Sequence, residues 1–186
     1  TSVDRDDLQD GGAGQWVKTV AAIRGQCPTI KIETLIPDFQ GDTHLIRQVC
    51  EARPDVLAHN LETVESLQSV ARPQCRYEWS LKTLKIAAAT EGVIVKSGLM
   101  LGLGEKREEV IQAMKDLVYA GCQILSLGQY LRPSPAHMEV VDFIHPDRFA
   151  EYKVIGELLG LSHVEAGPLV RSSYLADQQA RAVGLD

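Results

Sequence analysis

The sequence lacks the features that mark membrane-spanning and nucleic-acid-binding proteins. It contains no apolar run of about 18 residues, so no transmembrane span is expected. Its 25 acidic side chains outnumber its 19 basic ones, and the net charge of −6 argues against a nucleic-acid or anionic-membrane partner. It also shows no signal peptide and no initiator methionine, and residues 1–4 are typical of the end of a strand. We therefore expect a piece of a longer protein.

Cysteine is scarce and poorly spaced for a metal. Cys27, Cys50, Cys75 and Cys122 are each more than 20 residues from the next, and no Cys-x-x-Cys pair occurs. This spacing fits neither a zinc nor an iron–sulfur site, so we expect free thiols in a reducing compartment. The five histidines also lack metal-ligand spacing. His59 is the one nearest a candidate site, although a core or surface role is favoured.

Two common enzyme signatures are absent as well. No Gly-x-Gly-x-x-Gly follows a first strand, so a dinucleotide-binding Rossmann fold has no support. No Gly-x-Ser-x-Gly occurs, so a hydrolase triad has none either. Gly102 and Gly104 could cradle a phosphate before a helix, but two glycines favour a tight turn between strand and helix.

What the sequence does contain is a regular alternation of apolar runs and amphipathic segments, in 186 residues of which 45% are apolar. Strands are predicted over residues 30–36, 56–59, 93–101, 124–131 and 163–166. Helices are predicted around residues 16–23, 45–50, 64–70, 79–88, 110–118, 149–159 and 176–182. Because the strands are apolar throughout, they fit a parallel α/β sheet covered by helices, either doubly wound or a barrel. We expect one domain over residues 1–186.

Polar side chains collect where these strands end, which is the edge at which parallel α/β folds carry their chemistry. The strand ends hold Asp4, Arg5, Asp38, Asn60, Glu62, Gln129 and the group 171–174. Glu33 and Lys96 instead lie inside apolar runs, where a charge is costly unless it is paired or faces a polar cavity. They predict either residues that face the lumen of a barrel or a structural ion pair.

The stretch at residues 167–174 places two hydroxyls, a guanidinium and a phenol behind a Gly-Pro turn. Proline ends the preceding element, so Arg171, Ser172, Ser173 and Tyr174 are presented on a loop, where binding residues are common. Taken alone, the stretch also fits a solvated loop before a short helix.

Several phrases together resemble the lipoyl synthase family of radical S-adenosylmethionine enzymes. They are Thr-Ser-Val-Asp-Arg-Asp-Asp-Leu at 1–8, Asp-Gly-Gly-Ala at 10–13, Pro-Asp-Phe at 37–39, His-Asn-Leu-Glu-Thr-Val at 59–64, Lys-Ser-Gly-Leu-Met-Leu-Gly-Leu-Gly-Glu at 96–105, Gly-Gln-Tyr-Leu at 128–131 and the stretch 167–174. They occur in the family's order and spacing. The resemblance implies a partial (β/α) barrel of the radical S-adenosylmethionine type, with parallel strands, outer helices and the first strand missing.

The resemblance also implies a reaction, the insertion of two sulfur atoms at C6 and C8 of a protein-bound octanoyl chain to make the lipoyl cofactor. In the family one [4Fe-4S] cluster cleaves S-adenosylmethionine to a 5′-deoxyadenosyl radical, and a second, auxiliary cluster donates the sulfur. The implied partners are octanoylated lipoyl carrier domains, such as dehydrogenase E2 subunits and the glycine cleavage H protein, and an electron donor such as ferredoxin or flavodoxin. The implied location is the cytoplasm, or the mitochondrion in a eukaryote.

The family's Arg-Ser-Ser-Tyr motif supplies a serine as the oxygen ligand of the auxiliary cluster. Matched residue by residue, this ligand falls on Ser173, with Ser172 as the alternative, and Arg171 and Tyr174 would support the cluster. The family's two cysteine sets precede the segment seen in this sequence. Because the spacing of the four cysteines present is wrong for replacing them, we expect this chain alone to bind none of these cofactors fully and to be inactive.

Position at strand ends or in the lumen assigns S-adenosylmethionine binding to Asp4, Arg5, Glu33, Asn60, Glu62, Lys96 and Gln129. Two alternatives stay open. Lys96 could form a Schiff base in a cofactor-independent (β/α) lyase or aldolase, or the chain could be a non-catalytic module that docks a carrier domain.

Overall fold

The computed structural model describes residues 1–185 and contains a five-stranded parallel sheet. Its strands are β1 (Glu33–Leu35), β2 (Val56–Ala58), β3 (Ile94–Leu101), β4 (Ile124–Gln129) and β5 (His163–Ala166), and they lie in the sheet in sequence order. Crossovers of one hand between sequential neighbours put every connecting helix on the same face. This winding is that of a (β/α) barrel rather than a doubly wound sheet, as the family resemblance implied.

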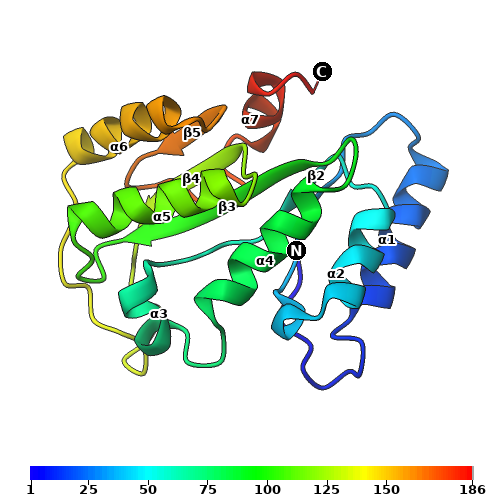
Figure 1. Ribbon diagram of the computed structural model, residues 1–186, viewed down its shortest axis with the longest axis horizontal. Coiled ribbons are helices and arrows are strands. Elements are labelled where there is room, and N and C mark those ends of the chain that lie inside the picture. Colours follow the sequence, from blue (N-terminus) through cyan, green and yellow to red (C-terminus); the bar gives the residue numbers. More distant parts are fainter. Residues whose placement is uncertain (186) are drawn as a thin grey trace.

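The helices alternate with these strands (Figure 1). α1 (Ala13–Gln26) precedes β1, and a short 3₁₀ turn, η1, spans Phe39–Gly41. The crossovers hold α2 (Thr43–Glu51), α3 (Glu65–Ala71), α4 (Tyr77–Ala88), α5 (Arg107–Tyr119) and α6 (Pro146–Leu159), and α7 (Ala176–Ala182) follows the last strand. Glycines end two of these helices, since Gly121 after α5 and Gly160 after α6 have φ values of 84° and 115°.

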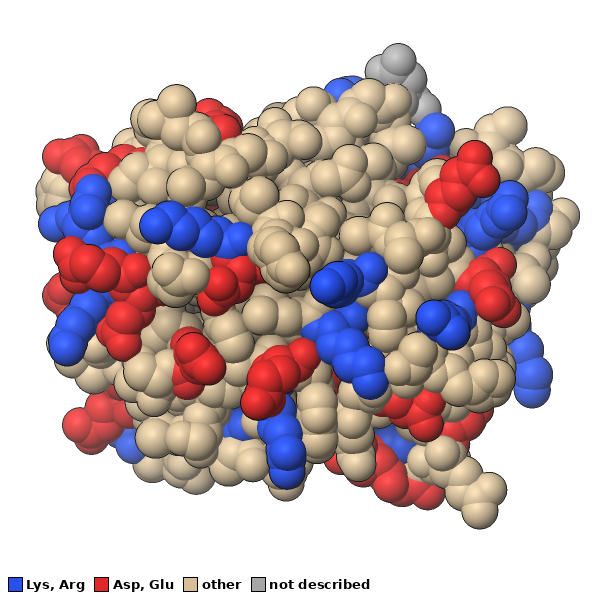
Figure 2. Space-filling model, in the orientation of Figure 1, with Lys and Arg blue, Asp and Glu red and all other residues tan. Residues whose placement is uncertain are grey.

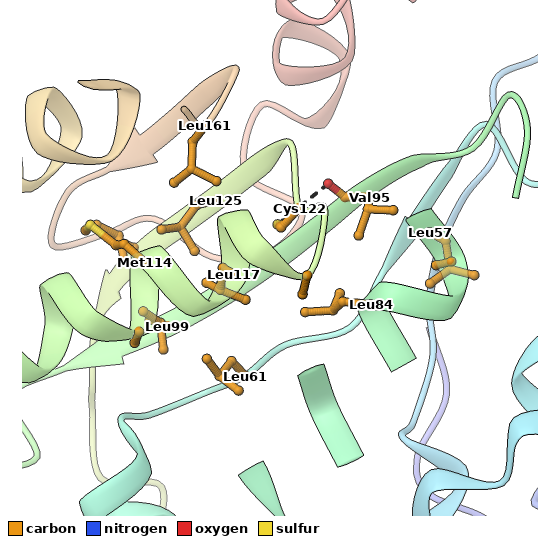
Figure 3. Close-up of a cluster of buried hydrophobic side chains, with 14 of the residues drawn as sticks. Leu57, Leu61, Leu84, Val95, Leu99, Met114, Leu117, Cys122, Leu125 and Leu161 are labelled. Carbon is orange, nitrogen blue, oxygen red and sulfur yellow. Dashed lines mark hydrogen bonds between the residues drawn. The ribbon is translucent and has the colours of Figure 1, made fainter. Parts of the chain in front are cut away.

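One hydrophobic core lies between the sheet and the helices. Alternate strand residues point into it, among them Leu57, Val95, Leu99 and Leu125, which Figure 3 labels. Leu127 and Val164 belong to the same core. The helices contribute Ile46, Leu84, Val110, Met114, Leu117 and Phe149. Each such buried side chain stabilises the fold by about 1.5–3 kcal/mol, so this face of the sheet is the one that holds the helices in place.

The opposite face of the sheet carries polar residues beside apolar ones such as Val56 and Ile124, and the C-terminal segment covers part of it. Glu33, Lys96 and Ser126 alternate along their strands with the core residues, so they project from this second face. After β5 the chain turns back over β4, and α7 packs against β5. In Figure 1, α7 accordingly stands apart from the layer formed by α4 and α5. A partial barrel would have its lumen on this face.

None of the helices described is long and apolar enough to cross a membrane. On the face shown in Figure 2, acidic and basic side chains are interspersed, and no continuous basic surface is visible there. A nucleic-acid-binding face would instead show clustered lysine and arginine.

Two of the expected strands differ in the structure. Residues 1–4 form no strand, and they line a cavity instead. The strand predicted over 30–36 is paired only from Glu33 to Leu35, because β1 is an edge strand that pairs with β2. Ile30, outside the pairing, is 50% exposed. The other predicted elements match the observed ones to within a few residues at their ends.

Candidate functional site

Two adjoining cavities open at the carboxyl edge of the sheet. The first, of about 260 Å³, lies over the ends of β3 and β4 and is bounded by residues 170–172. The second, of about 400 Å³, lies beside the ends of β1 and β2 and is bounded by residues 1–4 and Arg72. Asn60 and Glu62 line both cavities, so these two side chains form the wall between them.

Glu62 stands in this wall on a strained backbone. Its φ of 69° lies in the left-handed region, which costs a non-glycine residue of order 1–3 kcal/mol. Two backbone hydrogen bonds hold it there: its N–H donates to Gly98 O at 2.9 Å, and its carbonyl accepts from Met100 N at 2.8 Å. Burial raises the pKa of the Glu62 carboxyl, while the Asn60 hydrogen bond and the Arg72 guanidinium oppose that shift.

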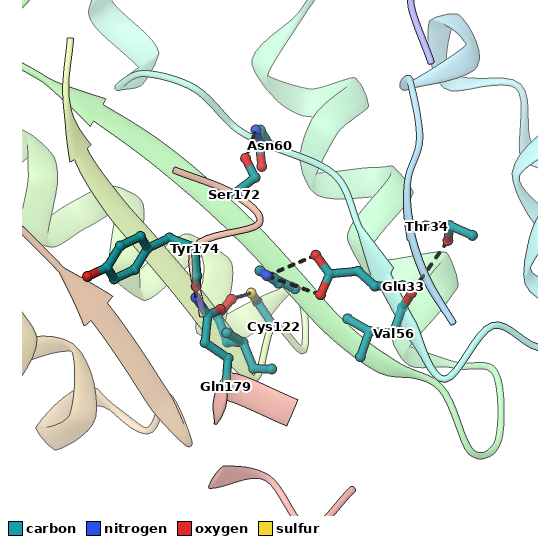
Figure 4. Close-up of polar contacts among 10 residues, drawn as sticks. Glu33, Thr34, Val56, Asn60, Cys122, Ser172, Tyr174 and Gln179 are labelled. Carbon is teal, nitrogen blue, oxygen red and sulfur yellow. Dashed lines mark hydrogen bonds and ion pairs between the residues drawn. The ribbon is translucent and has the colours of Figure 1, made fainter. Parts of the chain in front are cut away.

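The Asn60 side chain joins the wall to the C-terminal loop. Its Nδ2 donates to Glu62 Oε1 at 3.0 Å and to Ser172 Oγ at 2.8 Å. Figure 4 shows Asn60 and Ser172 facing each other. The Asn60 backbone carbonyl accepts from Arg72 Nη1 at 3.4 Å. Its Oδ1 lies over Gly98, where an added Cβ would come within 2.8 Å of that oxygen, so the glycine makes room for the amide.

The C-terminal loop is seated on the sheet by a second glycine. A Cβ added at Gly128 would lie 2.2 Å from the carbonyl oxygen of Val170. A backbone hydrogen bond holds the loop close to β4 at this point, since Gly167 N donates to Leu127 O at 3.1 Å. The loop therefore rests directly on the backbone of β4.

The four side chains predicted on this loop divide into two pairs. Arg171 and Ser172 line the first cavity, and Arg171 Nη1 donates to the Val170 carbonyl at 2.6 Å. Ser173 and Tyr174 are exposed and line neither the first nor the second cavity. The loop is thus not simply solvated, because half of the motif is built into a cavity.

Of the two site residues predicted near the N-terminus, only Asp4 lines one of these cavities. Asp4 lines the second cavity, where burial raises the pKa of its carboxyl and the Arg72 guanidinium opposes the shift. Arg5 turns away, and its guanidinium donates two hydrogen bonds to the Asp7 carboxylate at 2.7 Å each. Arg5 lines neither of the two cavities that share Asn60.

Gln129 lines the first cavity, but its amide also holds the loop that follows β4. Nε2 donates to the carbonyls of Tyr130 and Asp142 at 3.0 Å each, and Oε1 accepts from Ile144 N at 2.9 Å. These side-chain hydrogen bonds are therefore all to backbone groups. Its clearest contribution to the site is to fix the cavity's outer edge.

Glu33 and Lys96 form an ion pair with each other. Lys96 Nζ donates to the two Glu33 carboxylate oxygens at 2.9 and 3.1 Å, contacts that Figure 4 marks at Glu33. The Lys96 side chain is fully buried, while the Glu33 side chain is 23% exposed. Neither lines either cavity. This geometry matches the structural ion pair and speaks against a Schiff-base lysine, whose amine must be free and accessible.

The polar groups of His59 and Gly102 are hydrogen-bonded to other parts of the protein. The His59 ring bonds with Ile36 O through Nδ1 and with Ser80 Oγ through Nε2, both at 2.9 Å, and burial lowers its pKa to about 4. The N–H groups of Gly102 and Leu103 donate to the Glu105 carboxylate at 2.6 and 2.9 Å. These donors are already taken, which confirms the tight turn rather than a phosphate cradle.

Two residues of the site were missed at the level of sequence. Arg72 lines the second cavity and bonds to Asn60, but in the sequence it stood in an Arg-Pro pair that signalled only the end of a helix. Ser126 lines the first cavity, is 3% exposed, and its Oγ has no hydrogen-bond partner. A hydroxyl inside an otherwise apolar strand was the signal that could have found it.

The donor set fits a small polar ligand better than a metal. Among residues 1–185, no three His, Cys, Asp or Glu side chains converge on a point where a metal could bind. The cysteines are free as expected, and burial raises the pKa of the Cys122 thiol to about 12. Carboxylates, two amides, two guanidinium groups and an unpartnered hydroxyl line the two cavities instead. Such groups suit a ligand with ammonium, carboxylate and hydroxyl functions.

Comparison with known proteins gives a consistent set of relatives. No protein-family model matches the chain. A lipoyl synthase of Treponema denticola is 49% identical over 178 residues, which is 96% of this chain and 61% of the relative. A mitochondrial lipoyl synthase of Nematostella vectensis is 51% identical over 178 residues, again 96% and 61%. A lipoyl synthase of Phocaeicola vulgatus is 47% identical over 184 residues, 99% and 64%. The chain thus spans about three fifths of the length of these curated relatives.

Proposed function

The chain belongs to the lipoyl synthase family, and we propose that it forms the part of such an enzyme that binds S-adenosylmethionine and a protein-bound octanoyl chain. The reaction is the insertion of sulfur at C6 and C8 of that chain, which makes the protein a sulfurtransferase of lipoate biosynthesis. When bound, S-adenosylmethionine supplies the oxidising power that removes hydrogen from unactivated carbon. The protein's own task is to bind, orient and shield the reactants.

The wall between the two cavities supports this proposal. Asn60 and Glu62 reach both cavities, so a ligand in one can be held by the same side chains that border the other. The second cavity offers carboxylates at Asp4 and Glu62 for an ammonium group and a guanidinium at Arg72 for a carboxylate. The first is bordered by Met100 and Leu131 as well as polar groups, which suits a reactant that is partly apolar.

The residues described do not fit a complete iron–sulfur site. No group of three ligating side chains converges within residues 1–185. Ser173 stays the predicted oxygen ligand, with Ser172 as the alternative. Two observations favour Ser173 as the ligand: its side chain is exposed, whereas the Ser172 hydroxyl already accepts a hydrogen bond from Asn60. In this proposal the carrier domain and a ferredoxin- or flavodoxin-type donor are the partners.

Calorimetric titration of the chain with S-adenosylmethionine tests the proposal. We expect binding to the wild type, and at least about tenfold weaker binding to Asn60→Ala, because a hydrogen bond to a charged group is worth about 1.5–3 kcal/mol. Glu91→Gln, which changes an exposed side chain outside both cavities, should bind like the wild type. The proposal is wrong if the wild type does not bind or if Asn60→Ala binds equally well.

A second titration, with an octanoylated carrier domain, separates docking from cofactor binding. We expect heat of binding from the octanoylated domain and a weaker signal from the same domain without its acyl chain. Equal binding of both forms would mean that the chain docks the carrier domain without recognising its octanoyl group, and that part of the proposal would be wrong.

A further inference from the structure

The two serines of the C-terminal loop have different surroundings. Ser172 is half-buried, and its Oγ lies 2.8 Å from Asn60 Nδ2, a residue 112 positions earlier in the chain. Ser173 is exposed, and among the residues described its hydroxyl makes no hydrogen bond. The neighbouring side chains of one short motif are therefore placed for different tasks.

We propose that Ser172 is a positioning residue, whose hydroxyl holds the Asn60 amide against Glu62 and so couples the docking of the C-terminal loop to ligand binding in the two cavities. The inference rests on the proposed function only for the identity of the ligand, S-adenosylmethionine. The contact itself is a property of this chain.

The hydrogen bonds of Asn60 explain why one hydroxyl can have this effect. The amide has two N–H donors, and they are used on Glu62 and on Ser172. This leaves Oδ1 as the free acceptor, in a fixed direction. A flipped amide would set its oxygen against the Glu62 carboxylate, which repels it. Without the Ser172 hydroxyl, one donor loses its partner and the amide loses one of its two anchors.

The sheet is shaped to seat both partners of this contact. Gly98 leaves space for the Asn60 amide, and Gly128 leaves space for the Val170 carbonyl beside Ser172. Neither glycine has a positive φ, so the backbone conformation does not require glycine there, and only the close approach does. Met100 pairs with Gly128 and lies two residues after Gly98, so the two hollows are diagonal neighbours on adjacent strands.

Coupling between the loop and the ligand follows by linkage. A ligand that touches Asn60 or Glu62 in the seated arrangement favours that arrangement, and the seated loop then favours the ligand by the same factor. The net worth of one hydrogen bond, about 1 kcal/mol, corresponds to about a fivefold change in affinity. Removing the Ser172 hydroxyl should therefore weaken S-adenosylmethionine binding about fivefold.

Amide hydrogen exchange of residues 167–175, measured by mass spectrometry, tests the contact without any turnover. In the ligand-free chain we expect faster exchange in Ser172→Ala and in Asn60→Ala, and no further increase in the double variant, because both remove the same bond. Ser173→Ala should exchange like the wild type. Ser172→Thr, which keeps the hydroxyl, should restore protection and shows that the loss is not a folding defect.

Adding S-adenosylmethionine completes the test. It should slow exchange of the loop in the wild type and do so less in Ser172→Ala. If loop exchange does not depend on Ser172, or if Ser173→Ala has the larger effect, the inference is wrong whatever binds. If Ser172 does protect the ligand-free loop but S-adenosylmethionine does not bind the wild type, the proposed function fails and the coupling to this ligand fails with it, while the contact stands.

Discussion

The ion pair between Glu33 and Lys96 predicts an unequal response to the loss of either partner. Lys96 is fully buried and Glu33 is 23% exposed. Glu33→Gln would leave the ammonium in the interior without its counter-charge, and breaking a buried pair in this way costs about 3–5 kcal/mol. Lys96→Met would leave the carboxylate partly in contact with water, so a cost of about 1–3 kcal/mol is expected. Glu33→Gln should therefore destabilise the protein more than Lys96→Met does.

Urea unfolding followed by circular dichroism measures these differences. The double variant Glu33→Gln/Lys96→Met should be more stable than Glu33→Gln alone, because it removes the stranded charge, and the four proteins together give the coupling energy. Glu151→Gln is the matched control. Its carboxylate pairs with Arg107 at 2.7 Å, but both side chains are about 40% exposed, so its loss should cost less than about 1 kcal/mol.

Two results would refute this reasoning. One is a cost for Glu33→Gln no greater than that of the exposed control, which would mean that water reaches Lys96. The other is a greater cost for Lys96→Met than for Glu33→Gln, which would mean that packing of the lysine stem rather than its charge dominates.

Four further predictions concern titration, backbone strain and metal binding. Below pH 6.5 the unfolded chain protonates His59 while the folded chain does not until about pH 4, so this residue should remove about 3 kcal/mol of stability across that interval; proton NMR should show His59 still neutral at pH 5. Burial raises the pKa of Glu62, so its ionised form is disfavoured in the folded state, and Glu62→Gln should be more stable than the wild type at pH 7; in urea unfolding, the difference should vanish as pH falls below about 4.5. Gly102→Ala should cost clearly more than about 2 kcal/mol in urea unfolding, because its Cβ would lie 2.3 Å from other atoms at a φ of 102°, whereas Gly92→Ala, with open space around it, should cost only the backbone strain of about 1–2 kcal/mol. Anaerobic reconstitution with iron and sulfide should give no stable [4Fe-4S] absorbance and no cleavage of S-adenosylmethionine. A stable cluster would contradict the conclusion that residues 1–185 lack a complete set of cluster ligands.

The sequence predicted the elements well because each carries its own local signal. Apolar runs bounded by glycine or proline predicted β2 to β5 to within a few residues. It overextended β1, because an apolar run does not reveal whether a neighbouring strand is there to pair with it. Pairing at an edge is set by the rest of the sheet.

The charged residues inside the strands show a second feature that the sequence alone could not predict. The sequence left Glu33 and Lys96 between two explanations, because their pairing depends on register across three strands. Lys96 is opposite Ala58, and Glu33 is opposite Val56, two residues earlier on the same strand. The small Ala58 side chain leaves room for the long lysine to reach across. Register of this kind follows from the assembled sheet and not from either strand alone.

The site shows why some of it was visible in the sequence and some was not. Asn60 and Glu62 could be placed from their position after an apolar run, but the bond from Asn60 to Ser172 joins loops that only the folded sheet brings together. Ser126 was hidden because hydroxyls in strands are commonly satisfied by backbone. Its unpartnered Oγ becomes informative only once the neighbours are known.

The costs that the chain carries around this wall are themselves an argument for function. A left-handed Glu62 costs about 1–3 kcal/mol, and each strand glycine costs about 0.5–1 kcal/mol relative to alanine. Gly98 and Gly128 add nothing to the hydrophobic core, since their open sides face Asn60 and Val170. Packing alone would favour larger side chains on these strands. The strained Glu62 and the two strand glycines together shape one contact, between the cavity wall and the loop that carries Ser172. They are best explained by a ligand whose binding depends on that contact.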